Sequence, residues 1–202
     1  MTDQFEHVSA KEEQANINPP AKWLWYLLYL HIGNLVLSFI PPIWPTDPVT
    51  PWIGSVLYAG MAVCLFQLTP SCFRYRKAAI YTGISLILTL LVKIPLLPNL
   101  LTMAASVLAI ISSYQELYAH AEVVHAKDVT LSRKWRNLFI WELVIGVISG
   151  FFSAAAVTIM VLADMELEQI VSLITGSMLL VALIPSILRI RYLRKTIRLF
   201  EE

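Results

Sequence analysis

The chain has 202 residues, of which 57% are hydrophobic and 14% are charged, and its formal net charge at pH 7 is +1. Soluble proteins contain roughly half apolar and a quarter charged residues, and one soluble core of this length cannot enclose such an excess of apolar side chains. The apolar residues lie in long runs with few charges, which is typical of a membrane protein, and the near-neutral balance does not favour a nucleic-acid partner.

Residues 1–22 are polar and mixed in charge, and no basic stretch leads directly into a short apolar core. This pattern differs from that of a cleaved signal peptide. We therefore expect 1–22 to be a mobile tail on the cytosolic side of a membrane.

Six apolar runs follow, each long enough to cross a bilayer as a helix that rises about 1.5 Å per residue. Prolines interrupt the chain between several of them, because proline lacks the amide hydrogen that a continuing helix needs. The sequence therefore predicts an all-α fold, a polytopic membrane protein with a six-transmembrane-helix bundle over 23–188. The approximate spans are 23–40, 52–69, 78–94, 99–115, 138–163 and 169–188.

The fourth helix should continue beyond the membrane as a cytosolic extension to about Lys127, since nothing in 114–126 breaks a helix. Thr130 or Ser132 is expected to cap the helix that follows.

The distribution of Lys and Arg predicts an orientation in which both termini are cytosolic, because short cytosolic loops carry an excess of these residues. Lys93 is then the single exception on the outer side. We expect an integral protein of the plasma membrane. The residues assigned to the inside are Lys11, Lys22, Arg74, Arg76, Lys77, Lys127, Arg133, Lys134, Arg136, Arg189, Arg191, Arg194, Lys195 and Arg198.

The C-terminal segment 189–202 has apolar residues near one helix face and basic residues on the other. Such a basic amphipathic helix end is predicted to lie in the membrane interface and to favour anionic lipids. The alternative is that these are ordinary cytosolic charges with no specific ligand. The basic residues assigned to lipid or partner contact are Arg133, Lys134, Arg136, Arg191, Arg194, Lys195 and Arg198.

Three polar residues in apolar runs are candidates for an intramembrane site: His31, Asn34 and Glu142. An ionisable residue inside a bilayer is costly and therefore a functional candidate. For His31 a structural role is favoured, because no other ionisable side chain is expected at the same depth. Glu142 is expected to pair with Arg74, Arg76 or Lys127, and the alternative is a buried carboxylate that accepts a proton.

The polar half of the fourth helix holds a second candidate cluster, Glu116, His120, Glu122 and His125. Glu116 and His120 share one face, while Glu122 and His125 lie on roughly the opposite one. These side chains cannot converge on one ion from a straight helix, so neither a metal nor a cofactor is expected. The favoured interpretation is an amphipathic helix packed against a loop at Arg133–Trp135, with one face solvated.

Gly146, Gly150 and Ala154 recur at four-residue spacing, a register of small residues that lets two helices approach closely. We expect this face to pack against another helix, by default one of the same chain.

No catalytic motif stands out in the sequence. The pattern favours a non-enzymatic subunit, scaffold or regulator of a membrane complex that acts through its basic cytosolic face. The alternative is a small permease or carrier with a polar path through His31, Asn34 and Glu142. A third interpretation is an intramembrane enzyme at the cytosolic surface that uses Glu116, His120 or His125, although no nucleophile stands beside a base at a recognisable spacing.

Overall fold

A computed structural model describes residues 19–37, 50–91, 98–163 and 168–201, with 50–51, 98–99, 152–163 and 168–182 described as backbone alone. The secondary structure over these ranges is helical. The elements are α2 (Ala21–Leu37), α4 (Thr50–Gln67), α5 (Phe73–Leu91), α6 (Pro98–His125), α7 (Val129–Ala163) and α8 (Glu168–Glu201).

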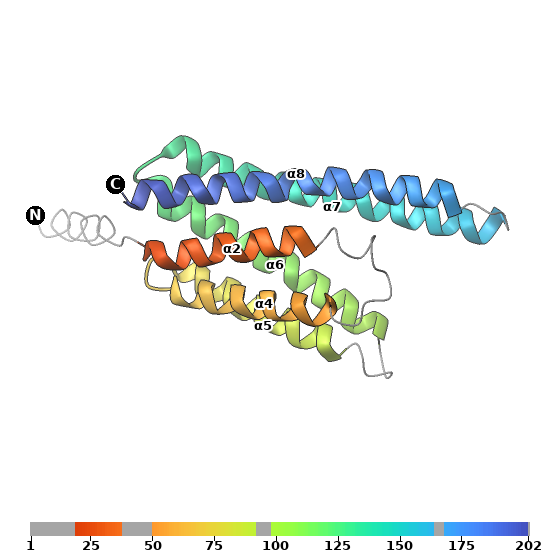
Figure 1. Ribbon diagram of the computed structural model, residues 1–202, viewed down its shortest axis with the longest axis horizontal. Helices are drawn as coiled ribbons and strands as arrows, with labels where there is room; N and C mark the ends of the chain where they lie inside the picture. Colours follow the sequence, from red (N-terminus) through yellow and green to blue (C-terminus); the bar gives the residue numbers. More distant parts are fainter. Residues whose placement is uncertain (1–18, 38–49, 92–97, 164–167, 202) are drawn as a thin grey trace, which may run out of the picture.

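The six helices run up and down and form a ring. Each helix packs against the next one along the chain, and α8 packs back against α2, so that the ring closes. The start of α2, the end of α8 and the connections 67–73 and 125–129 lie together at one end, which we call the terminal end (Figure 1). The opposite end, where the α7–α8 hairpin extends beyond the other helices, is the far end.

The prediction of an all-α six-helix bundle is confirmed. Among the described residues, one helix, Leu100–His125, is both long enough and apolar enough to cross a membrane, and the shorter apolar helix is Trp52–Gln67. The structure therefore shows the six-helix bundle, and the six membrane spans belong to the function proposed below.

The helix boundaries follow local sequence signals, with one correction. α6 does continue past residue 115, to His125. The predicted caps of the next helix, Thr130 and Ser132, are wrong, because α7 begins at Val129 and Asp128 accepts a hydrogen bond from the Leu131 amide at 2.9 Å. Arg133–Trp135 consequently lies within the first turns of α7 and not in a loop.

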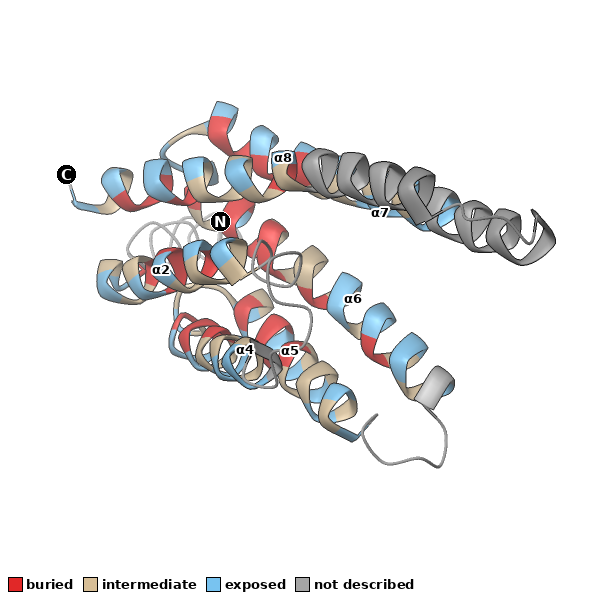
Figure 2. Ribbon diagram, turned by 45° about the vertical axis from the view of Figure 1, so that its right-hand side comes forward, coloured by how far each residue is buried: buried red, intermediate tan, exposed pale blue. Residues whose placement is uncertain are grey.

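The apolar core is concentrated toward the terminal end, where most of the buried segments in Figure 2 lie. Trp135 of α7 is fully buried and stacks on the His120 ring at a centroid distance of 4.6 Å. Its indole N–H donates to the Thr196 hydroxyl of α8 at 3.1 Å. Fully buried leucines and an isoleucine of the same core come from α2, the connection between α4 and α5, α6 and α8: Leu24, Leu27, Leu68, Leu117, Leu193 and Ile197.

Large apolar side chains cover the outside of the ring. Phe151 is 72% exposed, Val56 70% and Trp141 60%. Similar residues are exposed on the other described helices, including Tyr29, Val36, Phe66, Ile80, Ile87, Leu100, Met103, Val107, Val147, Ile184 and Ile187. Large apolar side chains thus face outward on the described helices, whereas several charged groups lie inside the ring.

Toward the far end the α7–α8 hairpin diverges from α6 (Figure 1). The predicted close packing of the small-residue face is not seen at Gly146 and Gly150, where a Cβ atom added to either glycine would meet nothing within 4 Å among the side chains that the structure describes. Ala154 lies among the residues whose side chains are not described. The glycine in close contact is instead Gly60 of α4, whose Cβ would come within 3.1 Å of the Leu30 side chain of α2.

Candidate functional site

His31 and Glu116 meet inside the ring. The Nε2 atom of His31, from α2, lies 2.8 Å from Oε1 of Glu116, from α6, and both residues are buried. The expectation that no other ionisable side chain lies at the depth of His31 is therefore wrong. The expectation of one solvated and one paired face on this part of α6 agrees with the burial pattern, because Glu116 and His120 are buried whereas Glu122 and His125 are exposed.

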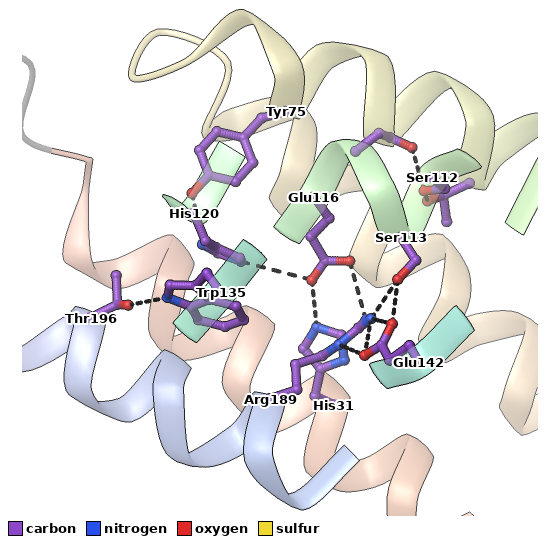
Figure 3. Close-up of polar contacts among 12 residues, drawn as sticks. His31, Tyr75, Ser112, Ser113, Glu116, His120, Trp135, Glu142, Arg189 and Thr196 are labelled. Atoms are coloured by element: carbon purple, nitrogen blue, oxygen red, sulfur yellow. Dashed lines mark hydrogen bonds and ion pairs between the residues drawn. The ribbon is translucent and has the colours of Figure 1, made fainter. Parts of the chain in front are cut away.

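Arg189 of α8 joins this pair to Glu142 of α7 (Figure 3). Its Nη1 atom lies 3.4 Å from Oε2 of Glu116, and its Nη2 atom lies 2.7 Å from Oε2 of Glu142. Ser113 completes the contact, because its hydroxyl accepts from Arg189 at 2.6 Å and donates to Glu142 at 2.7 Å. The predicted partners of Glu142, which were Arg74, Arg76 and Lys127, are replaced by Arg189.

We call His31, Ser113, Glu116, Glu142 and Arg189 the ionic cluster. It holds two carboxylates and one guanidinium, so it has one net negative charge when the imidazole of His31 is neutral and none when that imidazole is protonated. The Arg189 side chain is 15% exposed and those of Glu116 and Glu142 are 7% and 20% exposed. Groups removed from water to this degree need one another's charge, because an unpaired buried charge is strongly destabilising.

His120 extends the polar network toward the terminal end. The Tyr75 hydroxyl of α5 lies 2.8 Å from Nδ1 of His120, and Trp135 covers the other side of the ring. If the hydroxyl donates to Nδ1, the ring proton is on Nε2. That Nε2 atom has no hydrogen-bond partner and lies 3.8 Å from Oε1 of Glu116. His120 thus lies beside the ionic cluster without being bonded into it.

Hydroxyl groups line the interface between α5 and α6. Thr82 and Ser112 approach to 2.6 Å, and Ser112 donates to the Ala78 carbonyl at 3.0 Å, so Thr82 donates to Ser112. Ser85 donates to the Ala105 carbonyl at 2.9 Å. Sequence reasoning missed these residues and Arg189. The available signal was a serine or threonine every three or four residues in α5, at Thr82, Ser85 and Thr89, with further serines in α6.

Two cavities meet at the ionic cluster. One, of about 340 Å³, is lined by Asn34, Glu142, Gly146, Ser149, Pro185 and Ser186 together with His31 and Arg189. The other, of about 220 Å³, is lined by Tyr58, Thr82, Ser85, Ser112 and Ser113 and again by His31, Asn34, Glu116 and Arg189. We call the two together the chamber. The three residues predicted as an intramembrane site, His31, Asn34 and Glu142, all line it.

The other predicted residues lie outside the chamber. Glu122 is exposed and forms an ion pair with Arg74, and His125 is exposed at the end of α6. The basic residues Arg133, Lys134, Arg136, Arg191, Arg194, Lys195 and Arg198 are exposed toward the terminal end. On the predicted apolar face of the C-terminal helix, Leu193 and Ile197 are fully buried in the core, while Ile190 and Phe200 are partly buried.

Within the described ranges, no group of three or more His, Cys, Asp or Glu side chains is placed to hold a metal ion. Comparison with models of known protein families, with curated proteins and with solved structures finds no match to this chain.

Proposed function

We propose that this chain is a multi-pass protein of the plasma membrane, and that it acts as a small permease or carrier whose solute binds in the chamber. The observation that carries the proposal is the ionic cluster itself, which lines two cavities inside a ring whose outer surface is apolar.

The distribution of polarity supports a membrane location. In water, such an extensive apolar surface would favour aggregation, whereas in lipid it is the favourable arrangement. Ionisable residues of membrane proteins face the bundle interior and pair with one another, as His31, Glu116, Glu142 and Arg189 do. In this proposal α2, α4, α5, α6, α7 and α8 each span the bilayer.

The charges support the proposed orientation. In the described part of the chain, the exposed Lys and Arg residues lie toward the terminal end, at which α2 begins and α8 ends. Positive residues near the ends of membrane helices mark the cytosolic side. We therefore place the terminal end, and both termini, in the cytosol.

The two ends of the ring suggest how a carrier would work. The terminal end is closed by the core around Trp135, while the chamber lies on the far side of that core, where α7 and α8 diverge from α6. Carriers bind solute between a closed end and an open end and exchange the two states. The described arrangement corresponds to the state that is closed toward the cytosol.

Labelling of introduced cysteines tests the orientation. In a background in which the free thiols Cys64 and Cys72 are replaced by alanine, Thr46→Cys and Lys195→Cys should react with a membrane-impermeant thiol reagent from opposite sides of the membrane. Reaction of both from the same side would overturn the six-span proposal.

A vesicle assay tests the carrier function. Vesicles that contain the purified protein are loaded with a cell metabolite extract, and the solutes that they lose are measured by mass spectrometry against protein-free vesicles. We expect loss of at least one solute with the wild type and with Tyr29→Leu, an outward-facing control on the same helix. His31→Leu, which removes a group that lines both cavities, should abolish that loss. The absence of any protein-dependent loss would overturn the carrier proposal.

The second candidate is the scaffold or regulator, favoured by the exposed bases on the neighbouring helices α7 and α8. Anionic lipids or an acidic partner would contact these bases at the cytosolic surface. Under this hypothesis, Arg133→Gln, Lys134→Gln and Arg136→Gln together should abolish co-purification of the partner while the protein still inserts. Retention of the partner by the triple variant would contradict it.

A further inference from the structure

A groove between α6 and α7 leads from the outer surface to the ionic cluster. Its volume is about 420 Å³, within the roughly 300–1,000 Å³ typical of small-molecule sites. Apolar residues form most of it, namely Ala109, Ile110, Phe139, Leu143 and Val147. At its inner limit are the two polar residues Ser113 and Glu142, which belong to the ionic cluster.

The groove adjoins the chamber, because Glu142 and Gly146 line both the groove and the larger cavity of the chamber. In our proposal the passage between the two runs past these residues. Gly146 leaves that passage open, because a Cβ atom there would meet nothing within 4 Å. The outer part of the groove is bordered by Ile110, Leu143 and Val147, which are all exposed on the apolar outer surface.

The polar end of the groove favours a positively charged group. With neutral imidazoles the ionic cluster has one net negative charge, since Arg189 compensates only one of Glu116 and Glu142. Glu142 is the more exposed of the two carboxylates, at 20% against 7%, and it is the one that faces the groove. Arg189 already contacts Glu142 at 2.7 Å and Glu116 at 3.4 Å, so an ammonium group at this end would be a second cation for the two carboxylates and would share Glu142 with Arg189.

We infer that the ligand of the chamber is an amphiphile with a single apolar chain and an ammonium head, and that it enters sideways from the bilayer through the groove between α6 and α7. This inference rests on the proposed function and names its substrate class. The head binds at Glu142, and the chain lies along Ile110, Phe139 and Val147.

Gly146→Leu gives a direct test, because its Cβ atom would meet nothing within 4 Å and the rest of its side chain would extend into the space where the groove and the chamber adjoin. Gly83→Leu is the matched control, since its Cβ also meets nothing within 4 Å and Gly83 lines none of the described cavities. The probes are dodecylammonium, dodecanol and dodecyl phosphate, which share one chain and differ in the head. Their effect on the thermal unfolding of the full chain is measured in a neutral detergent.

Dodecylammonium should raise the Tm of the wild type and of Gly83→Leu by about 5–10 °C at roughly one hundred times its Kd, and dodecanol and dodecyl phosphate should raise it less. Gly146→Leu should lose most of this increase. Equal stabilisation of Gly146→Leu and the wild type, or no stabilisation of the wild type, would overturn the inference. If dodecyl phosphate raises the Tm more than dodecylammonium does, and Gly146→Leu abolishes that rise, the site is real but its ligand does not have an ammonium head.

The metabolite-loaded vesicles separate this inference from the proposed function. If the wild type releases a solute, His31→Leu does not and Gly146→Leu does so at the wild-type rate, the carrier function stands and the lateral entry is wrong. If Gly146→Leu abolishes ligand stabilisation but no vesicle releases any solute, the amphiphile site stands and the carrier function is wrong.

Discussion

The terminal end and the far end of the ring differ in how they fill the space between the same six helices. Toward the terminal end, Trp135, Leu117 and Ile197 are fully buried and fill that space. Toward the far end, hydroxyl-bearing residues line cavities, including one of about 500 Å³ lined by Ser55, Ser85, Thr102 and Ser106. The ionic cluster lies at the boundary. Apolar packing thus closes one end, and the charges are held where that packing stops.

The largest loss of stability is expected from a change at Arg189, the cation of the ionic cluster. Arg189→Met leaves Glu116 and Glu142 without their cation and should lower the free energy of unfolding by about 3–5 kcal/mol. The measurement is unfolding by sodium dodecyl sulfate in mixed micelles. The control is Arg191→Met on the exposed side of α8, which should change stability by less than about 0.5 kcal/mol. Equal stability of the two variants would show that the carboxylates are solvated.

The packing of the terminal end is tested by Trp135→Phe. The change removes the hydrogen bond to Thr196 and leaves a space beside His120, so it should cost about 2 kcal/mol in the same unfolding assay. Trp141→Phe on the outer surface is the control and should cost less than about 0.5 kcal/mol. If the two variants lose the same stability, the two regions are packed alike and the comparison fails.

The link between the closed end and the ionic cluster is tested by Tyr75→Phe. It leaves Nδ1 of the buried His120 without a partner and should cost about 1–2 kcal/mol. Tyr26→Phe, at an exposed position of α2, is the control with no expected effect. A neutral result for Tyr75→Phe would place water beside His120 and would mean that the terminal end is not sealed.

The smallest effect concerns Cys72, in the connection between α4 and α5. Burial, with the nearby Glu122 carboxylate, raises the pKa of this thiol from 9.0 to about 11. Alkylation requires the thiolate, so in a Cys64→Ala background the rate should still rise about tenfold per pH unit above pH 9.0. A plateau near pH 9.0 would show that the connection is open to water.

The raised pKa of Cys72 also makes the stability of the folded chain depend on pH. Between pH 9.0 and about 11 the unfolded chain has lost the Cys72 proton while the folded chain keeps it. The folded state then binds more protons, so the stability contributed by this group is complete below pH 9.0 and is lost as the pH rises toward about 11.

Local sequence determined the number and order of the helices, because hydropathy and helix breakers act over a few residues. The apolar runs, the prolines between them and the uninterrupted 114–126 segment gave an all-α six-helix bundle and the continuation of α6. The same runs made His31, Asn34 and Glu142 conspicuous, and all three line the chamber.

Only the tertiary structure decided which polar side chains meet. Glu116 lies 85 residues from His31 and 73 from Arg189, and these contacts depend on which face each helix turns toward the ring. In the sequence Arg189 looked like one more cytosolic base, because it begins a basic stretch that continues with Arg191 and Arg194. Those two are exposed in the structure, whereas Arg189 turns toward the ring. The glycines of α7 likewise looked like a packing face until the divergence of α7 from α6 left them open. Periodicity defines the faces of a helix, but the packing of the whole ring decides what each face contacts.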